Sequence, residues 1–212
     1  MEPSDRSRYL ALDLLGKYDN HISAGVLWKS TIKLYLNIRK QFSALHCVSY
    51  FSIAEVAIDL IRTKECNVNE RDSVGLTPLI WAAPYGHEGI VKLLLQQKHT
   101  QPDMPDTRHG RTALSWAAGS GHQGVVRLFF GPLFVNPGSI GHMWGITQVM
   151  SALFQRKSVK PDRPDAGGQT PLSWAAENGH DGVVKLLLGW EDVSPNRQSW
   201  SGTALVGRPE WA

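Results

Sequence analysis

The segment GVLWKST at residues 25–31 ends in Lys-Ser-Thr, as a phosphate-binding loop does. Such a loop needs glycine before its lysine, so that backbone amides can wrap the phosphates. Trp28 stands at that position here, and Ser23 replaces the first glycine of the motif. The segment therefore does not predict nucleotide binding.

Histidines that could bind a metal follow a different pattern. His87 and Glu88 begin like the zinc motif His-Glu-x-x-His, but Val91 occupies the second ligand position. Three Gly-His pairs recur along the chain: Gly86-His87, Gly121-His122 and Gly179-His180. If they lie on stacked helical layers about 8–10 Å apart, they cannot share one ion with Zn–N bonds of about 2 Å. We interpret these histidines as structural, tying a turn by hydrogen bonds.

The remaining reactive side chains also lack a catalytic arrangement. Cys47 falls on a predicted helix and Cys66 in a loop, without redox or ligand spacing between them. The recurrent carboxylates Asp72, Asp106 and Asp165 stand at turn positions, where aspartate bonds nearby backbone amides. We therefore expect no catalytic residue, no metal site and no cofactor, so the chain is predicted not to be an enzyme.

Composition sets the broad class. The 212 residues are 42% hydrophobic and 19% charged, which is enough apolar material for a packed core. The net charge of +3 is too weak to argue for nucleic acid. No apolar run approaches the roughly 20 residues of a membrane helix, and the start of the sequence does not resemble a signal peptide. We expect a soluble intracellular protein, cytoplasmic or nuclear, with no nucleic-acid, membrane or small-molecule partner.

Internal repeats dominate the sequence. Three segments align: LTPLIWAAPYGHEGIVKLLL (76–95), RTALSWAAGSGHQGVVRLFF (111–130) and QTPLSWAAENGHDGVVKLLL (169–188). Their anchoring threonines are Thr77, Thr112 and Thr170, so the first spacing is 35 residues and the second 58. A fainter copy starts at Ser43, and GITQVMSA (145–152) matches GLTPLIWA (75–82), placing another start near Thr147.

Each full unit is predicted to form two helices. Threonine is a good N-cap and proline is favoured at the next position, so Thr-Pro-Leu opens the first helix. The Gly-His pair ends it, because glycine accepts positive φ. A second apolar stripe with helical spacing follows, for example Ile90, Val91, Leu94 and Leu95. One unit cannot bury its stripe alone, so the units are predicted to stack into an all-α solenoid.

These residues resemble ankyrin repeats. The period, G-x-T-[PA]-L, the Ala-Ala pair, Gly-His and V-V-[KR]-L all match that family. The resemblance implies helix-turn-helix units joined by short hairpin loops, and a role in protein–protein interaction. The variant L-[SI]-W-A-A looks like long fungal ankyrin arrays, which often follow a NACHT-type nucleotide-switch domain. The usual histidine after Thr-Pro-Leu is present only as His46.

We divide the chain into three parts. Residues 1–42 do not fit the repeat and are expected to form a helical N-terminal cap or a linker. Residues 43–196 hold the repeats, which start near 43, 77, 112, 147 (truncated) and 170. Residues 197–212 form an incomplete terminal repeat, whose apolar edge we expect to be poorly protected.

The truncated unit has a geometric consequence. About 12 residues are missing between its start and the next loop. We expect a single helix, with the stripe Ile146, Val149, Met150, Leu153 and Phe154, to take the place of a second helix. Such a partial layer would bend the array between the Thr112 and Thr170 units.

The tryptophans Trp81, Trp116 and Trp174 share one register position. The resemblance implies an apolar, largely inward position, so we expect core packing, with indole N–H groups still able to reach a surface partner. A partner is expected on the concave face lined by hairpins and first-helix ends. The candidate partner-binding residues are Leu76, Tyr85, Arg108, Arg111, Ser120, Gln169, Glu177 and Asn178. Tyr85 and the two arginines are the best anchors, since aromatic and Arg side chains dominate binding hot spots.

Two functions remain open at this point. The favoured one is a non-enzymatic protein-binding scaffold, monomeric unless it belongs to a larger assembly. The alternative is a sensor or oligomerisation arm, as a fragment of a larger NACHT-type switch protein. The sequence does not identify the partner.

Overall fold

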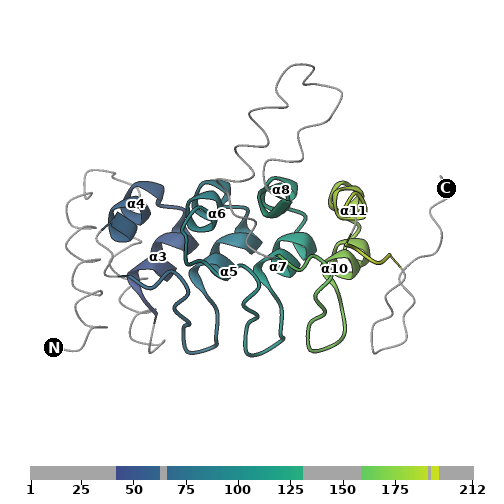
Figure 1. Ribbon diagram of the computed structural model, residues 1–212, viewed down its shortest axis with the longest axis horizontal. Helices are drawn as coiled ribbons and strands as arrows, with labels where there is room; N and C mark the ends of the chain where they lie inside the picture. The colour runs from purple at the N-terminus through teal and green to yellow at the C-terminus, as the bar shows by residue number, and fades with distance from the viewer. Residues whose placement is uncertain (1–41, 63–65, 131–158, 191, 196–212) are drawn as a thin grey trace, which may run out of the picture.

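The computed structural model describes residues 42–62, 66–130, 159–190 and 192–195, and these form helical hairpins stacked side by side (Figure 1). The first helices of the units are α3 (Ala44–Phe51), α5 (Pro78–Ala82), α7 (Ala113–Gly119) and α10 (Pro171–Glu177). The second helices are α4 (Ala54–Arg62), α6 (Glu88–Leu95), α8 (Gln123–Phe130) and α11 (Asp181–Leu188). The two sets form separate rows, and hairpin loops extend from the side of the first helices (Figure 1). The predicted all-α solenoid is confirmed.

Side-chain caps fix where the first helices begin. The hydroxyl of Thr112 accepts the Ser115 amide at 3.2 Å, and Thr170 and Thr77 do the same at their own helices. Ser43 instead forms a capping box with His46. Each of these bonds satisfies an amide that the helix itself leaves without a partner.

Glycines end the first helices in the left-handed region. Gly86, Gly121 and Gly179 have φ values of 72°, 77° and 70°. In the Thr77 unit the α-helix ends earlier, and Ala83–Tyr85 forms a 3₁₀ turn, η1. Pro84 explains this difference, since it has no amide hydrogen for the helical ladder.

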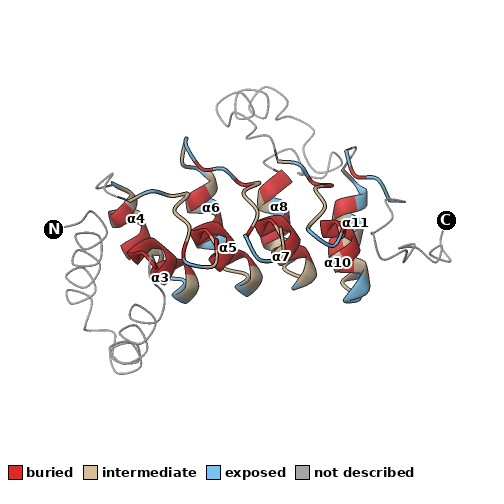
Figure 2. Ribbon diagram, turned by 90° about the horizontal axis from the view of Figure 1, so that it is seen from below, coloured by how far each residue is buried: buried red, intermediate tan, exposed pale blue. Residues whose placement is uncertain are grey.

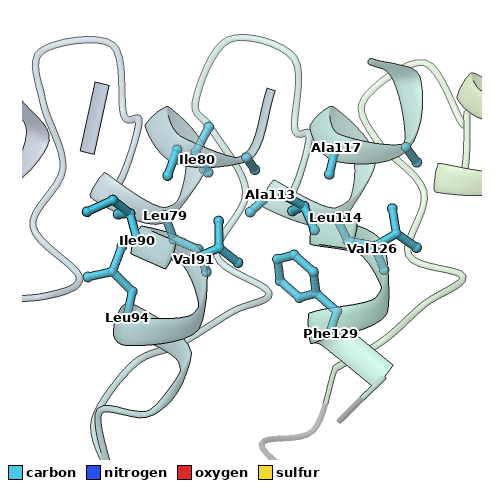
Figure 3. Close-up of a cluster of buried hydrophobic side chains, with 14 of the residues drawn as sticks. Leu79, Ile80, Ile90, Val91, Leu94, Ala113, Leu114, Ala117, Val126 and Phe129 are labelled. Atoms are coloured by element: carbon cyan, nitrogen blue, oxygen red, sulfur yellow. The ribbon is translucent and has the colours of Figure 1, made fainter. Parts of the chain in front are cut away.

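The core lies where the two helices of a unit meet those of the next. Leu79 and Leu114 from first helices pack with Ile90, Val91 and Val126 from second helices (Figure 3). Ile90, Val91 and Val126 are fully buried. Figure 2 shows buried residues on the sides where helices meet and exposed ones at hairpin tips and helix ends. The i, i+3, i+4 stripe of the sequence therefore faces the neighbouring layers.

The expectation of a partial layer between the Thr112 and Thr170 units is wrong. The His180 ring bonds to the Gly119 carbonyl, as the His122 ring bonds to Pro84 one layer earlier. The Lys160 amide donates to the Asp103 carboxylate at 2.8 Å, repeating the 2.7 Å bond from the Gln101 amide to Asn69. The Thr170 unit therefore stacks directly on the Thr112 unit, in the same register as a regular step.

These contacts leave no room for another layer between the Thr112 and Thr170 units. The proposed helix 146–154 lies outside the described residues, as do the cap 1–41 and the terminal segment 197–212. The local match of GITQVMSA to a repeat start misled the sequence interpretation.

A pair of glycine substitutions separates backbone strain from contact between layers. Gly121 and Gly179 both have positive φ, but an added Cβ at Gly121 would lie 2.8 Å from the His180 ring, whereas Gly179 has open space. We expect Gly179→Ala to lower the free energy of unfolding by about 1 kcal/mol, the cost of left-handed backbone. Gly121→Ala should cost at least about 1 kcal/mol more, because His180 must move and lose its hydrogen bond. Urea denaturation followed by circular dichroism measures both, and equal losses would contradict the interlayer role of His180.

Candidate functional site

One aspartate in each hairpin connects the loop to the first helix. In the Thr77 unit, Oδ1 of Asp72 accepts the amides of Val74 and Leu76, both at 2.9 Å. Its Oδ2 accepts the Trp81 indole N–H at 3.0 Å. The same indole bond joins Trp116 to Asp106 at 3.0 Å and Trp174 to Asp165 at 2.9 Å. The turn role predicted for these aspartates is confirmed, but the sequence interpretation missed their bond to tryptophan.

The tryptophans are structural, although only one is fully in the core. Trp81 is buried, whereas Trp116 and Trp174 are half-buried. The sequence left open whether the indole N–H groups reach a surface partner; in the structure all three donate to hairpin carboxylates. Sequence register alone could not separate these outcomes, since the three positions are equivalent.

The Gly-His histidines connect successive layers. The Nε2 atoms of His87, His122 and His180 lie 2.9, 2.8 and 3.0 Å from the carbonyl oxygens of Tyr50, Pro84 and Gly119. Each carbonyl belongs to the end of the preceding first helix. These bonds satisfy C=O groups that a helix leaves without intrahelical partners. Among the described residues, no group of three or more His, Cys, Asp or Glu side chains is arranged to hold a metal ion.

His46 occupies a buried polar pocket at the start of the array. Its Nδ1 accepts the Ser43 amide at 3.1 Å, and its Nε2 lies 3.1 Å from the Glu70 carbonyl and 3.0 Å from that of Leu76. Burial lowers the pKa of His46 from 6.5 to about 4, against smaller opposing effects of Asp72 and the two carbonyls. The neutral ring, with its proton on Nε2, therefore fits this pocket.

Both cysteines are unsuited to thiolate chemistry. Cys47 is buried against Phe42 and Trp81, and burial raises the pKa of its thiol to about 12. Burial also raises the pKa of Cys66, whose thiol donates to the Leu60 carbonyl at 3.1 Å. Reactive cysteines are exposed and have a lowered pKa, so neither residue has the properties of a nucleophile.

The candidate partner-binding residues fall on register columns along the stack. Tyr85, Ser120 and Asn178 are the equivalent residues at the ends of three first helices, and all are exposed. Arg108, at a hairpin tip, and Glu177 are also exposed. Leu76, Arg111 and Gln169, which precede the anchoring threonines, are half-buried. We call these eight residues the hairpin face.

Tyr85 belongs to an aromatic group that the sequence interpretation did not identify. Its ring lies 5.0 Å from that of Tyr50, which in turn lies 4.8 Å from Phe51. Tyr85 is 49% exposed and Phe51 38%, so both present aromatic surface. The Ser43 unit has the most divergent sequence, so comparison with the other units did not identify Tyr50 and Phe51 as neighbours of Tyr85.

Arg111 is engaged within the structure. Its guanidinium carbon lies 3.4 Å from the centroid of the Trp174 ring and 4.7 Å from that of Trp116. Its Nε lies 3.5 Å from Oδ2 of Asp165, as an ion pair. Arg111 therefore joins two units, whereas Arg108 on the same hairpin is exposed.

This architecture defines a helical repeat protein in which threonine caps the first helix of three successive units. A family model of ankyrin repeats, in three copies, matches residues 30–137, and a further ankyrin repeat matches residues 167–200. The chain belongs to the ankyrin-repeat family, whose members generally mediate protein–protein interaction. The matches leave residues 138–166 between them, consistent with an insertion at that junction. No curated protein matches this chain, and none of the described helices is long and apolar enough to cross a bilayer.

The carboxylate–indole bond can be tested at Asp106. Asp106→Asn retains the oxygen that accepts the turn amides but places NH₂ against the Trp116 N–H. We expect the free energy of unfolding to fall by about 1–2 kcal/mol, because one buried donor loses its acceptor. Trp116→Phe should remove that conflict, so the double variant should be less destabilised than the sum of the single variants by about 1 kcal/mol. Additive losses in denaturant titrations would show that the bond contributes nothing.

The His46 pocket predicts a pH dependence. Because the folded pKa is lowered, the stability from neutral His46 is complete above pH 6.5 and is lost as the pH falls towards about 4. Within that window the unfolded state binds a proton that the folded state excludes, at roughly 1.4 kcal/mol for each pH unit. We expect His46→Gln to be less stable at pH 7.5 but to show a shallower decline. Thermal melts from pH 7.5 to 4.5 test this, and parallel curves for both proteins would contradict it.

Proposed function

We propose that this chain is a non-enzymatic scaffold that binds a protein partner on the hairpin face. The observation that carries the proposal is the contrast between register columns. The Thr, Asp, Trp and Gly-His positions form internal bonds in successive units, whereas the column of Tyr85, Ser120 and Asn178 is exposed and differs from unit to unit. A backbone held in this way is preorganised, so the hairpins and helix ends lose little backbone freedom on binding.

Tyr85 and Arg108 are the proposed anchors. Tyrosine and arginine dominate binding hot spots, and these two residues are exposed at the end of a first helix and at the next hairpin tip. Arg111, Leu76 and Gln169 form the half-buried floor of the face. Ser120, Glu177 and Asn178 extend it as a polar surface towards the C-terminal unit.

A second possibility is that the repeats act as the sensor or oligomerisation arm of a larger NACHT-type protein inside the cell. The variant L-[SI]-W-A-A and its similarity to fungal arrays support this alternative. A nucleotide-binding segment encoded upstream in the same reading frame would favour the arm, and its absence would favour the independent scaffold.

A binding experiment tests the face directly. Proximity labelling with the full chain identifies partners, and calorimetry with a purified partner then measures affinity. We expect Tyr85→Ala and Arg108→Ala each to weaken binding about tenfold or more, equivalent to at least about 1.4 kcal/mol. Lys92→Ala and Lys185→Ala, which change exposed residues on second helices, are matched controls and should bind normally. Loss of binding in the lysine variants alone would place the partner on the other surface.

A further inference from the structure

The connection between the Thr112 and Thr170 units is longer in sequence than the connection between the Thr77 and Thr112 units. The connection from a second helix to the next hairpin aspartate covers residues 96–105 at the regular junction but 131–164 at this one. A longer connection holds its ends together less effectively, although the cost grows slowly with length. Contacts between the layers must therefore supply more of the attachment here.

The contacts between the Thr77 and Thr112 units differ in charge from those between the Thr112 and Thr170 units. At the regular junction, Asn69 Nδ2 donates to the His99 carbonyl at 2.6 Å, and Leu76 is half-buried against the apolar core. At the longer junction, Asp103 stands in place of Asn69, and the Arg163 guanidinium donates to its carbonyl at 3.0 Å. Burial raises the pKa of Asp103, while the charges of Arg163 and Lys160 act in the opposite direction. At the position before the anchoring threonine, the Thr77 unit has Leu76 and the Thr112 unit has Arg111.

A second charged contact at this junction is formed by four residues, Arg111, Trp116, Asp165 and Trp174, which we call the Arg111 cluster. The guanidinium is within the range of cation–π attraction from tryptophans of both units. Its ion-pair partner belongs to the Thr170 unit, and the two side chains are only 19% and 4% exposed. Partly buried pairs are screened less by salt than exposed ones. Asp165 also accepts the Trp174 indole, so the same carboxylate fixes both groups.

We propose that the Arg111 cluster is an electrostatic attachment that holds the Thr170 unit on the array, and that this unit separates as a body when the attachment is weakened. Separation interrupts the hairpin face between Ser120 and Asn178, so the state of the junction decides whether a partner meets one continuous face. The attachment itself does not depend on partner binding, whereas its consequence for a partner rests on the proposed function. Apolar contacts, such as the Phe130 and Trp190 rings at 4.1 Å, keep the separated state a minor one.

Hydrogen exchange of the full chain measures this minor state, because local opening exposes amides before global unfolding does. The amides of α11 report on the Thr170 unit, and those of α6 report on the rest of the array. For Arg111→Ala we expect α11 exchange to rise about tenfold, equivalent to about 1.4 kcal/mol, while α6 exchange changes less than about twofold. Arg111→Lys keeps the charge but loses the planar stacking surface. Its α11 exchange rate should lie between those of the unaltered protein and Arg111→Ala. Arg108→Ala, on the same hairpin, is the matched control and should leave both helices unchanged.

Salt provides a second measurement on the unaltered protein. Raising NaCl from about 0.1 to 1 M shortens the screening length from about 10 to 3 Å. We expect α11 exchange to accelerate relative to α6, and Arg111→Ala to reduce that salt response. The proposal is overturned if α11 and α6 respond together, if the unaltered protein shows no salt effect at α11, or if Arg108→Ala matches Arg111→Ala.

Discussion

The structure depends on one carboxylate in each hairpin. Oδ1 of Asp72 or Asp165 accepts turn amides while Oδ2 accepts the indole of the same unit. One group thereby fixes the loop conformation and its position against the first helix. A buried carboxylate needs several donors to offset its lost hydration, so hairpin and helix must form together. The exposed hairpin tips then project from a fixed base.

Most of the array could be predicted from sequence because its determinants are local. Threonine caps, positive-φ glycines and helical apolar stripes act within about ten residues, and each recurs in register. The carboxylate–indole bond was also visible in principle: units with tryptophan four residues after the threonine carry aspartate five or six residues before it. The Ser43 unit lacks tryptophan and has Cys47 at that position. The partners of Arg111 could not be inferred, since they depend on which layers touch.

The junction after α8 shows where local similarity fails as evidence. An eight-residue match, GITQVMSA, predicted a unit in register, yet the structure stacks the Thr170 unit on the Thr112 unit directly. The stack is a sum of interfaces between neighbouring layers. The His180 and Lys160 bonds complete a regular interface only when no layer intervenes. Because that interface is complete, no further layer lies between the two units, whatever the resemblance of the intervening sequence to a repeat.

Positions whose residue differs from unit to unit are not all on the exposed surface. Tyr85, Ser120 and Asn178 differ from one another and are exposed. Leu76, Arg111 and Gln169 differ as well, yet they are half-buried, and Arg111 is bound to the next unit. Within that column, Leu76 packs against the apolar core, whereas Arg111 pairs with Asp165 of the next unit. Among the candidate anchors, Arg111 is therefore held by contacts to the next unit, whereas Arg108 is exposed.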